Sequence, residues 1–478
     1  MIDGHTLLAR GWPSGPLIGQ ALSLARTQTA AGLPESDVQA LLDRIHDDPE
    51  AILAGQPGFE LAQALAELRR QPDPPEVRAA PLDFPVWGRE LIDPAAIRQM
   101  HDAMRLPVTA AGALMPDAHV GYGVPIGGVV ALENAVAPYM VGVDIACRMM
   151  LSVYTADDLA FLDETPRRDA LRRTIREESR FGIGARFAPR DRRDHAVLED
   201  PDWSATKLLR SLKDKAHSQL GTSGTGNHFV DAGRLAVDAS GAEALGISEG
   251  TYLAVLTHSG SRGVGATIAN RYSKLARAET PLPRELQALA WLGLETELGQ
   301  EYWTSMNLAG RFASACHHTL HEALAASLGI EPIAQVENHH NFAWIETHEI
   351  DGEAREVVVH RKGATPAGEG VLGVVPGSQG HPSYVVRGKG SCRSLHSASH
   401  GAGRQMGRKQ AIRTIPKAER NEWLRERGVE LLGSGMDEAP QAYKDIDEVL
   451  ALQADLAEPI ARFDPEIVLM ASDGKSEG

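Results

Sequence analysis

Residues 252–263 read Tyr252-Leu253-Ala254-Val255-Leu256-Thr257-His258-Ser259-Gly260-Ser261-Arg262-Gly263, an apolar run followed by a loop of small and polar residues. The apolar run predicts a short buried strand, and the loop carries a histidine with an arginine four residues later. Residues 284–328, read as two helices, and 419–461 show helical periodicity. Because strands and helices do not alternate regularly, the sequence predicts an α+β fold of mixed sheets with surrounding helices. Further strands are predicted over 124–132, 140–145 and 356–360.

The first 84 residues predict a separate small helical region. Leu17–Ala31 is amphipathic and stops before Gly32, and Ser36 with Gln39 has the spacing of a capping box at a second helix. A third helix is predicted over Glu60–Arg70, before a proline-rich linker at 72–75. No residue here is a candidate catalytic group. We therefore expect a packing or docking role for residues 1–84 and a catalytic domain over residues 85–478.

Composition excludes several classes of protein. The chain has 478 residues, and no apolar run is long enough for a transmembrane helix. The N-terminus lacks the basic and apolar regions of a secretory signal, and three cysteines cannot build a disulfide framework, so a cytoplasmic location is expected. A net charge of −16 argues against a non-specific nucleic-acid coat but allows a local basic groove.

Four loops collect the residue types that bind transition metals. Asp144 and Cys147 end the segment 141–147, and His228 ends the glycine-rich loop 221–228. His258 follows the strand quoted above, and the fourth loop offers His339 and His340. A lone histidine is more often structural than a ligand, but the combined set suits two divalent ions, of zinc, manganese, iron or cobalt. On the helical stretch a rival set has the periodicity of ordinary packing: Cys316, His317 and His321.

A fifth segment, Ser397-Ala398-Ser399-His400-Gly401-Ala402-Gly403-Arg404, places a histidine among small residues. Small residues allow close approach of a ligand to the backbone, an imidazole is a nucleophile, and the guanidinium suits phosphate. Phosphoryl or nucleotidyl transfer through His400 is one interpretation, and a glycine-rich turn with an incidental histidine is the other. The basic pair Arg361-Lys362, with the turn at 376–380, suggests a further phosphate or nucleic-acid backbone site.

Taken in order, the motifs resemble the RtcB family of RNA-splicing ligases, over roughly residues 85–465. The resemblance rests on an ordered set of segments, none of which is a common generic signature. They are Pro116–Gly123, Val141–Cys147, Gly226–Phe229, His258–Arg262, His339–Asn341, Arg361–Thr365, Pro376–Ser378, Ser399–Arg404 and Glu438–Lys444.

The resemblance implies a GTP- and Mn²⁺-dependent ligase that joins RNA 3′-phosphate or 2′,3′-cyclic phosphate ends to 5′-hydroxyl ends. His400 would take GMP from GTP and pass it to the RNA 3′-phosphate. Two Mn²⁺ ions would share Cys147, and an archease-type activator is a candidate partner. By resemblance, the metal ligands are Asp144, Cys147, His228, His258 and His340, and the nucleotide-binding residues are Asn227, Phe229, Asp231, Ser378, Ser383, Ala402, Gly403 and Tyr443. Arg262 and Arg404 would hold RNA or nucleotide phosphates.

The chain departs from the family pattern at several positions. Arg148 replaces a glycine after Cys147, which could alter access to that residue or add an RNA contact, and Gly407-Arg408 replaces a Ser-Arg pair. Asp231 replaces a glutamate that contacts guanine, and the family's C-terminal lysine aligns with Met470, with Lys475 further along. These changes leave a second hypothesis open, a metal-dependent cyclic phosphodiesterase that has lost ligation. A divergent paralogue with a role in RNA repair fits the same departures.

Overall fold

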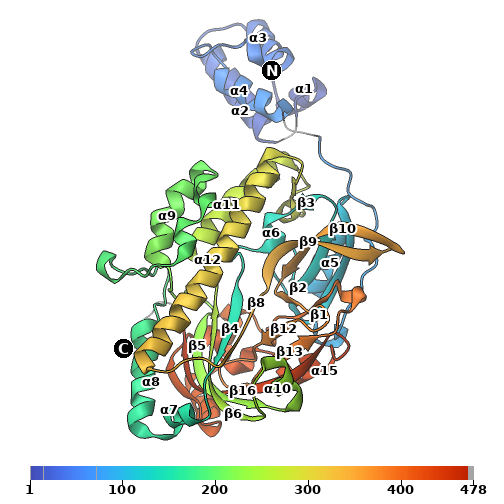
Figure 1. Cartoon of the computed structure of the whole chain (residues 1–478). Helices are drawn as coiled ribbons and strands as arrows, with labels where there is room; N and C mark the ends of the chain where they lie inside the picture. Colours follow the sequence, from blue (N-terminus) through green and yellow to red (C-terminus); the bar gives the residue numbers. More distant parts are fainter. Residues whose placement is uncertain (1, 14, 71–72, 472–478) are drawn as a thin grey trace. The chain divides into compact units, whose positions relative to one another are not determined.

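The computed structural model describes residues 2–13, 15–70 and 73–471 (Figure 1). The chain divides into two compact units at Pro74/Pro75, so the boundary expected after residue 84 falls inside the second unit. Residues just after Pro75 already belong to the second unit because they bond to its first helix. The Arg78 and Leu82 amides donate to the carbonyls of Arg105 and Met104, at 2.9 and 3.2 Å.

The first unit is a small helical cluster with a core of its own. Trp12, Leu42 and Ile45 are buried in it. The predicted capping box does not form, because α3 begins at Glu35 and Ser36 therefore lies inside its first turn. The helices are α1 (Gly4–Ala9), α2 (Pro16–Ala30), α3 (Glu35–Asp47) and α4 (Phe59–Arg70).

The largest sheet of the second unit carries most of the predicted site. It has eight strands, in the order β12-β13-β16-β5-β6-β4-β8, with β15 paired to β16. All neighbours are antiparallel except β15 and β16. The strands are β4 (Arg148–Val153), β5 (Phe229–Val237), β6 (Gly250–Ser259), β8 (Ala334–His339), β12 (Leu372–Val375), β13 (Ser383–Gly388), β15 (Glu430–Gly433) and β16 (Ala457–Met470).

A second, four-stranded antiparallel sheet has the order β1-β2-β10-β9. Two strand pairs, β3–β7 and β11–β14, complete the sheets of the described chain. The bounds are β1 (Thr109–His119), β2 (Ile126–Leu132), β3 (Ala135–Val136), β7 (Leu292–Gly293), β9 (Asn341–Ile350), β10 (Glu353–Lys362), β11 (Ala364–Pro366) and β14 (Ser397–Ser399).

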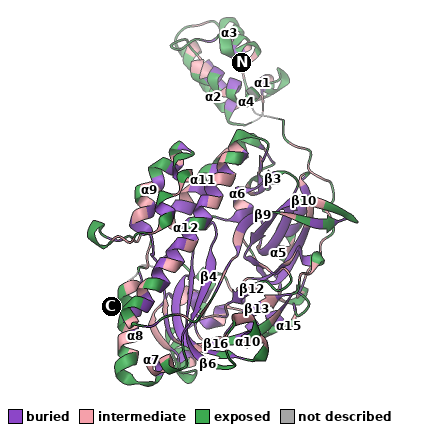
Figure 2. Ribbon diagram, viewed as in Figure 1, coloured by how far each residue is buried: buried purple, intermediate pink, exposed green. Residues whose placement is uncertain are grey.

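Helices surround these sheets, and the buried residues gather on the sheets and the inward helix faces (Figure 2). Together with the two sheets they confirm the predicted α+β class. The helices of this unit are α5 (Pro94–Met104), α6 (Pro138–Val141), α7 (Ala160–Asp163), α8 (Thr165–Glu178), α9 (Lys207–Gln219), α10 (Ala239–Leu245), α11 (Arg262–Glu279), α12 (Glu297–Leu328), α13 (Arg408–Thr414), α14 (Lys417–Glu426) and α15 (Ile446–Ala451).

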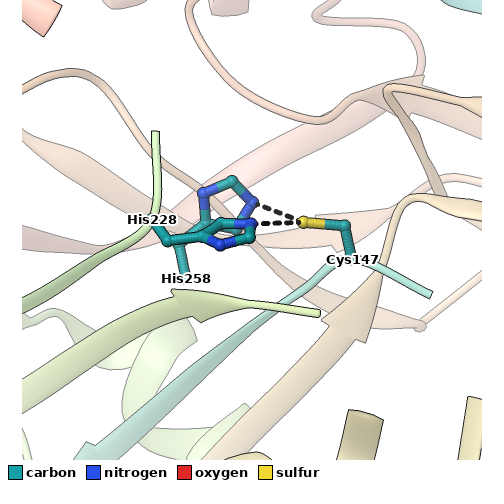
Figure 3. Close-up of side chains that lie close together, drawn as sticks. All are labelled: Cys147, His228 and His258. Atoms are coloured by element: carbon teal, nitrogen blue, oxygen red, sulfur yellow. Dashed lines mark hydrogen bonds between the residues drawn. The ribbon is translucent and has the colours of Figure 1, made fainter. Parts of the chain in front are cut away.

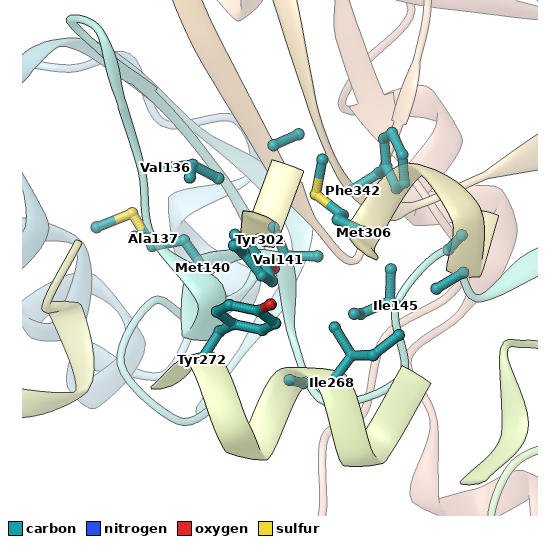
Figure 4. Close-up of a cluster of buried hydrophobic side chains, with 14 of the residues drawn as sticks. Val136, Ala137, Met140, Val141, Ile145, Ile268, Tyr272, Tyr302, Met306 and Phe342 are labelled. Carbon is teal, nitrogen blue, oxygen red and sulfur yellow. The ribbon is translucent and has the colours of Figure 1, made fainter. Parts of the chain in front are cut away.

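Three predictions of secondary structure were wrong. Residues 140–145 are not a strand: Met140 and Val141 lie in α6, among side chains of α11 and α12 (Figure 4). A fully buried apolar run has no periodicity that distinguishes a strand from a helix. Residues 284–328 contain one long helix, α12, rather than two, and residues 419–461 include β15 and the start of β16.

Candidate active site

The predicted metal ligands converge at one end of the large sheet. Cys147 immediately precedes β4, His228 immediately precedes β5, and His258 lies near the end of β6. His340 follows β8, and its amide donates to the Cys147 carbonyl at 3.0 Å. Since β4 is antiparallel to both β6 and β8, the start of β4 and the ends of the other two strands lie at the same end of the sheet.

The sulfur of Cys147 and the ring nitrogens of His228 and His258 lie about as close together as ligand atoms bound to one metal ion (Figure 3). Cys147 Sγ is 3.3 Å from His228 Nε2 and 3.1 Å from His258 Nε2. His258 Nε2 is 3.2 Å from His340 Nε2, and the Asp144 carboxylate is 3.0 Å from His228 Nε2. Ligands around one ion are separated by about 3.3–3.7 Å, given metal–ligand distances of about 2.0–2.3 Å.

The ionisation of these groups suits a cation. Burial lowers the pKa of His258 and His340 well below the ordinary value, so both rings are neutral at pH 7. His258 directs Nδ1 to the Asn227 carbonyl at 3.0 Å, which leaves the Nε2 lone pair facing Cys147. Burial, followed by the nearby charge of Asp144, raises the pKa of the Cys147 thiol, and a bound metal reverses that preference. Buried neutral imidazoles around a thiol fit a metal centre.

The rival histidines are engaged elsewhere. His339 stacks against Phe342 and Trp344, with ring centroids 5.0 Å apart in each pair, and does not line the cavity described below. His317 Nδ1 and His321 Nε2 lie 3.0 and 2.8 Å from the Thr257 hydroxyl in the interior. Within the described residues, only Cys147, His228 and His258 form a mutually close group of three ligand-type residues.

His400 is held beside this group by a residue to which sequence reasoning gave no role. Asp117, buried at the end of β1, accepts the Nδ1–H of His400 at 2.7 Å and its backbone amide at 3.1 Å. In this tautomer Nε2 carries the lone pair, so it is the ring nitrogen available for the predicted nucleophilic role. The ring centroids of His400 and His340 are 4.9 Å apart, so the predicted nucleophile adjoins a predicted metal ligand. Asp117 belongs to the motif Pro116–Gly123, and that motif is the sequence feature that could have identified it as a site residue.

One cavity of about 790 Å³ contains these groups and the predicted nucleotide site. Gly403 has φ +72°, and a Cβ there would lie 2.0 Å from the Asp117 carbonyl oxygen, so only glycine lets the nucleophile loop pack on β1. The cavity is lined by His400, all five predicted metal ligands and every predicted nucleotide-binding residue: Asn227, Phe229, Asp231, Ser378, Ser383, Ala402, Gly403 and Tyr443.

The residues at the two guanine departures also line this cavity. Asp231 is 5% exposed, its Oδ1 has no hydrogen-bond partner among the described residues, and burial raises its pKa well above the ordinary value. Met470 pairs with Phe229 in the β16–β5 register and lies in the same wall. An unsatisfied buried carboxyl group here is a polar contact available to a ligand. Lys475 is outside the described residues.

The predicted phosphate-binding arginines both contact other protein groups. Arg262 NH2 lies 3.0 Å from His228 Nδ1 and 3.8 Å from the Asp144 carboxylate. Arg404 pairs with the buried Glu438 at 3.2 Å and contacts the Tyr443 hydroxyl at 3.2 Å. Each guanidinium is thus held by residues that line the cavity, and phosphate binding by either stays a prediction.

Two other basic residues do not serve as the sequence suggested. Arg148, expected as an RNA contact, is 5% exposed and forms an ion pair with Glu337. Arg361, expected in a phosphate site, is buried and bonds both carboxylate oxygens of Glu346, at 2.7 and 2.9 Å. Lys362 does line the cavity, and its ammonium donates to the carbonyls of Tyr122 and Tyr139.

Comparison with known proteins identifies the family. The family model described as "tRNA-splicing ligase RtcB" matches residues 99–471. The chain belongs to the RtcB family. It is 33% identical to RNA-splicing ligase RtcB of Escherichia coli over 380 residues, covering 73% of this chain and 87% of the relative.

Other RtcB relatives match at a similar level. RNA-splicing ligase RtcB of Mycobacterium bovis is 31% identical over 428 residues, covering 77% of this chain and 98% of the relative. tRNA-splicing ligase RtcB of Thermococcus kodakarensis is 31% identical over 421 residues, covering 74% and 86%. The family model begins at residue 99, so the first helical unit lies outside the matched RtcB region. Within the described residues, no helix is long and apolar enough to cross a membrane.

Proposed function

We propose that the protein is an RNA ligase that joins RNA 3′-phosphate or 2′,3′-cyclic phosphate ends to 5′-hydroxyl ends, using GTP and two Mn²⁺ ions. The observation that carries this proposal is the position of His400. Its Nδ1 is fixed by Asp117, and its ring lies next to the metal ligand His340. A nucleophile, a metal-type cluster and a nucleotide-sized cavity therefore coincide.

In the proposed reaction, His400 Nε2 attacks the α-phosphorus of bound GTP. A nitrogen–phosphorus bond forms as the bond to pyrophosphate breaks, and Asp117 stabilises the charge that develops on the imidazole. The RNA 3′-phosphate then displaces the histidine and becomes guanylylated. The 5′-hydroxyl attacks that activated phosphorus, its proton leaves, and GMP departs.

The described residues support each part of this scheme. Asp144, Cys147, His228, His258 and His340 would hold the ions, which when bound neutralise phosphate charge as Lewis acids. Phe229 and Tyr443 offer aromatic faces to the base, and Asp231 offers its unpaired oxygen. A 2′,3′-cyclic phosphate must first be opened to a 3′-monophosphate in the same cavity.

Incubation with labelled GTP and Mn²⁺ tests the proposal. Wild type should form a covalent, acid-labile adduct, and His400→Ala should form none. Labelling of the His400→Ala protein would show that His400 is not the nucleophile. Labelling of wild type by ATP as well as by GTP would show that the site does not select guanine. The rival function, cyclic phosphate hydrolysis without ligation, predicts ring opening without GTP and no joined RNA.

The proposal also includes action in the cytoplasm and activation by an archease-type partner. The three free cysteines fit a reducing compartment such as the cytoplasm.

A further inference from the structure

The loop between β1 and β2 exposes an aromatic ring at the cavity. Tyr122 is 81% exposed and Val120 is 50% exposed, and both residues line the cavity that contains His400. A single exposed apolar side chain is ordinary on a protein surface. An exposed aromatic at a cavity that holds a nucleophile is a candidate contact for a substrate.

The backbone of this loop is fixed although the ring is not covered. The Gln99 side chain, on α5, donates to the Gly121 carbonyl at 2.6 Å and accepts the Gly121 amide at 3.0 Å. The buried Lys362 ammonium donates to the Tyr122 carbonyl. Gly123 has φ +75°, and a Cβ there would lie 3.1 Å from the Ala288 carbonyl oxygen. Because the backbone is already ordered, binding through Tyr122 costs little further loss of conformational entropy.

Helix α13 adds positive charge beside the same cavity. Arg408, its first residue, lines the cavity, but its charge is already balanced by Asp437 and Glu438, so among the described residues of this helix the free cations are the two that follow. Lys409 and Arg413 lie one turn apart, are exposed, and have no acidic partner within the described part of the chain. On its inner face, Ala411 and Ile415 pack with the segment 436–442, which precedes Tyr443. On a protein with a net charge of −16, such cations favour a polyanion locally.

We propose that Tyr122 is a stacking platform for an unpaired base at the RNA end delivered to His400, and that Lys409 and Arg413 bind phosphates of the same strand. The inference rests on the proposed function, because it takes RNA as the substrate. An aromatic face combined with basic side chains is the arrangement that binds single-stranded nucleic acid. A protein partner on Tyr122 is the competing explanation.

A binding assay without GTP or metal tests this directly. The probe is a short single-stranded RNA with a 3′-phosphate and 2-aminopurine as its terminal base. Wild type should quench the probe, and Tyr122→Ala should bind it about tenfold more weakly and lose the quenching. Tyr122→Phe, which keeps the ring, should bind nearly as wild type. Val371→Ala, at an exposed apolar residue that does not line the cavity, is the matched control.

The salt dependence of RNA binding tests the role of Lys409 and Arg413. Lys409→Glu with Arg413→Glu should lower the slope of log affinity against log salt by about 1.4, because two phosphate contacts on a single strand are lost. The control pair, Arg271→Glu with Lys274→Glu, changes exposed positions of α11 outside the cavity and should leave the slope unchanged.

Three results would overturn the inference. They are a wild-type protein that does not quench the probe, a Tyr122→Ala protein that binds RNA as wild type does, and a Tyr122→Phe protein as weak as Tyr122→Ala. The second result would leave Tyr122 to a protein partner. GMP labelling of wild type is a separate readout. Quenching without labelling rejects the ligase proposal and keeps the platform, whereas labelling without quenching does the reverse.

Discussion

At the scale of single residues, the orientation of His400 depends on Asp117. This carboxylate accepts both the ring Nδ1–H and the backbone amide of His400, and its own second oxygen has no partner among the described residues. One side chain therefore fixes both the tautomer and the position of the His400 ring. Orientation of this kind is a large part of what activates a catalytic histidine.

Replacing Asp117 by Asn tests this dependence. The amide is nearly isosteric but uncharged, and it can donate to Nδ1, which would place the ring proton on the attacking nitrogen. We expect the single-turnover rate of GMP transfer to His400 to fall by about 10²–10⁴-fold. A thermal unfolding profile close to that of wild type controls for misfolding. A transfer rate like that of wild type would show that Asp117 is only structural.

The two buried cysteines provide a matched pair for the metal site. Cys147 lies within 3.3 Å of two imidazoles, whereas Cys316 contacts the Gln219 carbonyl at 4.0 Å and has no imidazole contact within the described residues. We expect Cys147→Ala to lower transition-metal affinity by more than the about 10–100-fold that loss of an outer-shell partner costs. Cys316→Ala should keep its metal. Metal content of both purified variants, measured by mass spectrometry, decides the matter, and equal content would contradict the assignment of Cys147.

At the scale of elements, an ion pair between β4 and β8 also links these two strands of the site to α12. Arg148, the first residue of β4, forms an ion pair with Glu337 of β8 and donates to the Gly310 carbonyl of α12 at 3.3 Å. Glu337 also accepts from the Ser314 hydroxyl at 2.9 Å. Arg148, the residue after Cys147, therefore links β4 to α12. It does not line the cavity that contains His400.

This ion pair makes a prediction about stability. Arg148→Ala removes the permanent cation beside the partly buried Glu337 and leaves His318, at 3.3 Å, as its remaining ionisable partner within the described residues, so we expect a loss of about 2 kcal/mol in the free energy of unfolding. Combining Arg148→Met with Glu337→Gln removes both charges and should recover most of that loss. Denaturant titration of the single and double variants measures the difference. Equal destabilisation of the two would mean that packing, not charge, makes the contribution.

At the scale of the whole molecule, the chain is two units with separate cores. Residues of the first unit, such as Leu7 and Leu65, are buried within it, and the RtcB match starts only at residue 99. All residues assigned to the site belong to the second unit. The first unit therefore lies outside both the RtcB match and the candidate site.

Deletion of residues 1–74 tests this division. We expect the remaining chain to fold cooperatively, to bind metal, and to form the His400 adduct as the full chain does, since no site residue is lost. Calorimetry and labelled-GTP assays on the shortened protein are the measurements. Loss of adduct formation in a protein that still unfolds cooperatively would assign the first unit a direct catalytic role.

Much of the site could be read from residue types. Asp144, Cys147, His228, His258 and the pair His339-His340 stand out because thiols, imidazoles and carboxylates together in loops are typical of metal sites, whereas the choice of His340 came from the family resemblance. The strand over 252–256 was also predicted correctly, since a short aliphatic run bounded by polar residues favours a strand. The segment 140–145 was not, because a fully buried run carries no periodicity.

The sequence by itself determined the α+β class, the family and the set of chemical groups in the site. Only the tertiary structure decided which groups meet in one cavity and which are engaged by neighbours. His400 acquires its orientation from Asp117, 283 residues earlier in the chain, whereas Arg148 and Arg361 are withdrawn into ion pairs. Side-chain identity is local information, but hydrogen-bond partners and burial are set by strands that are distant in sequence and adjacent in space.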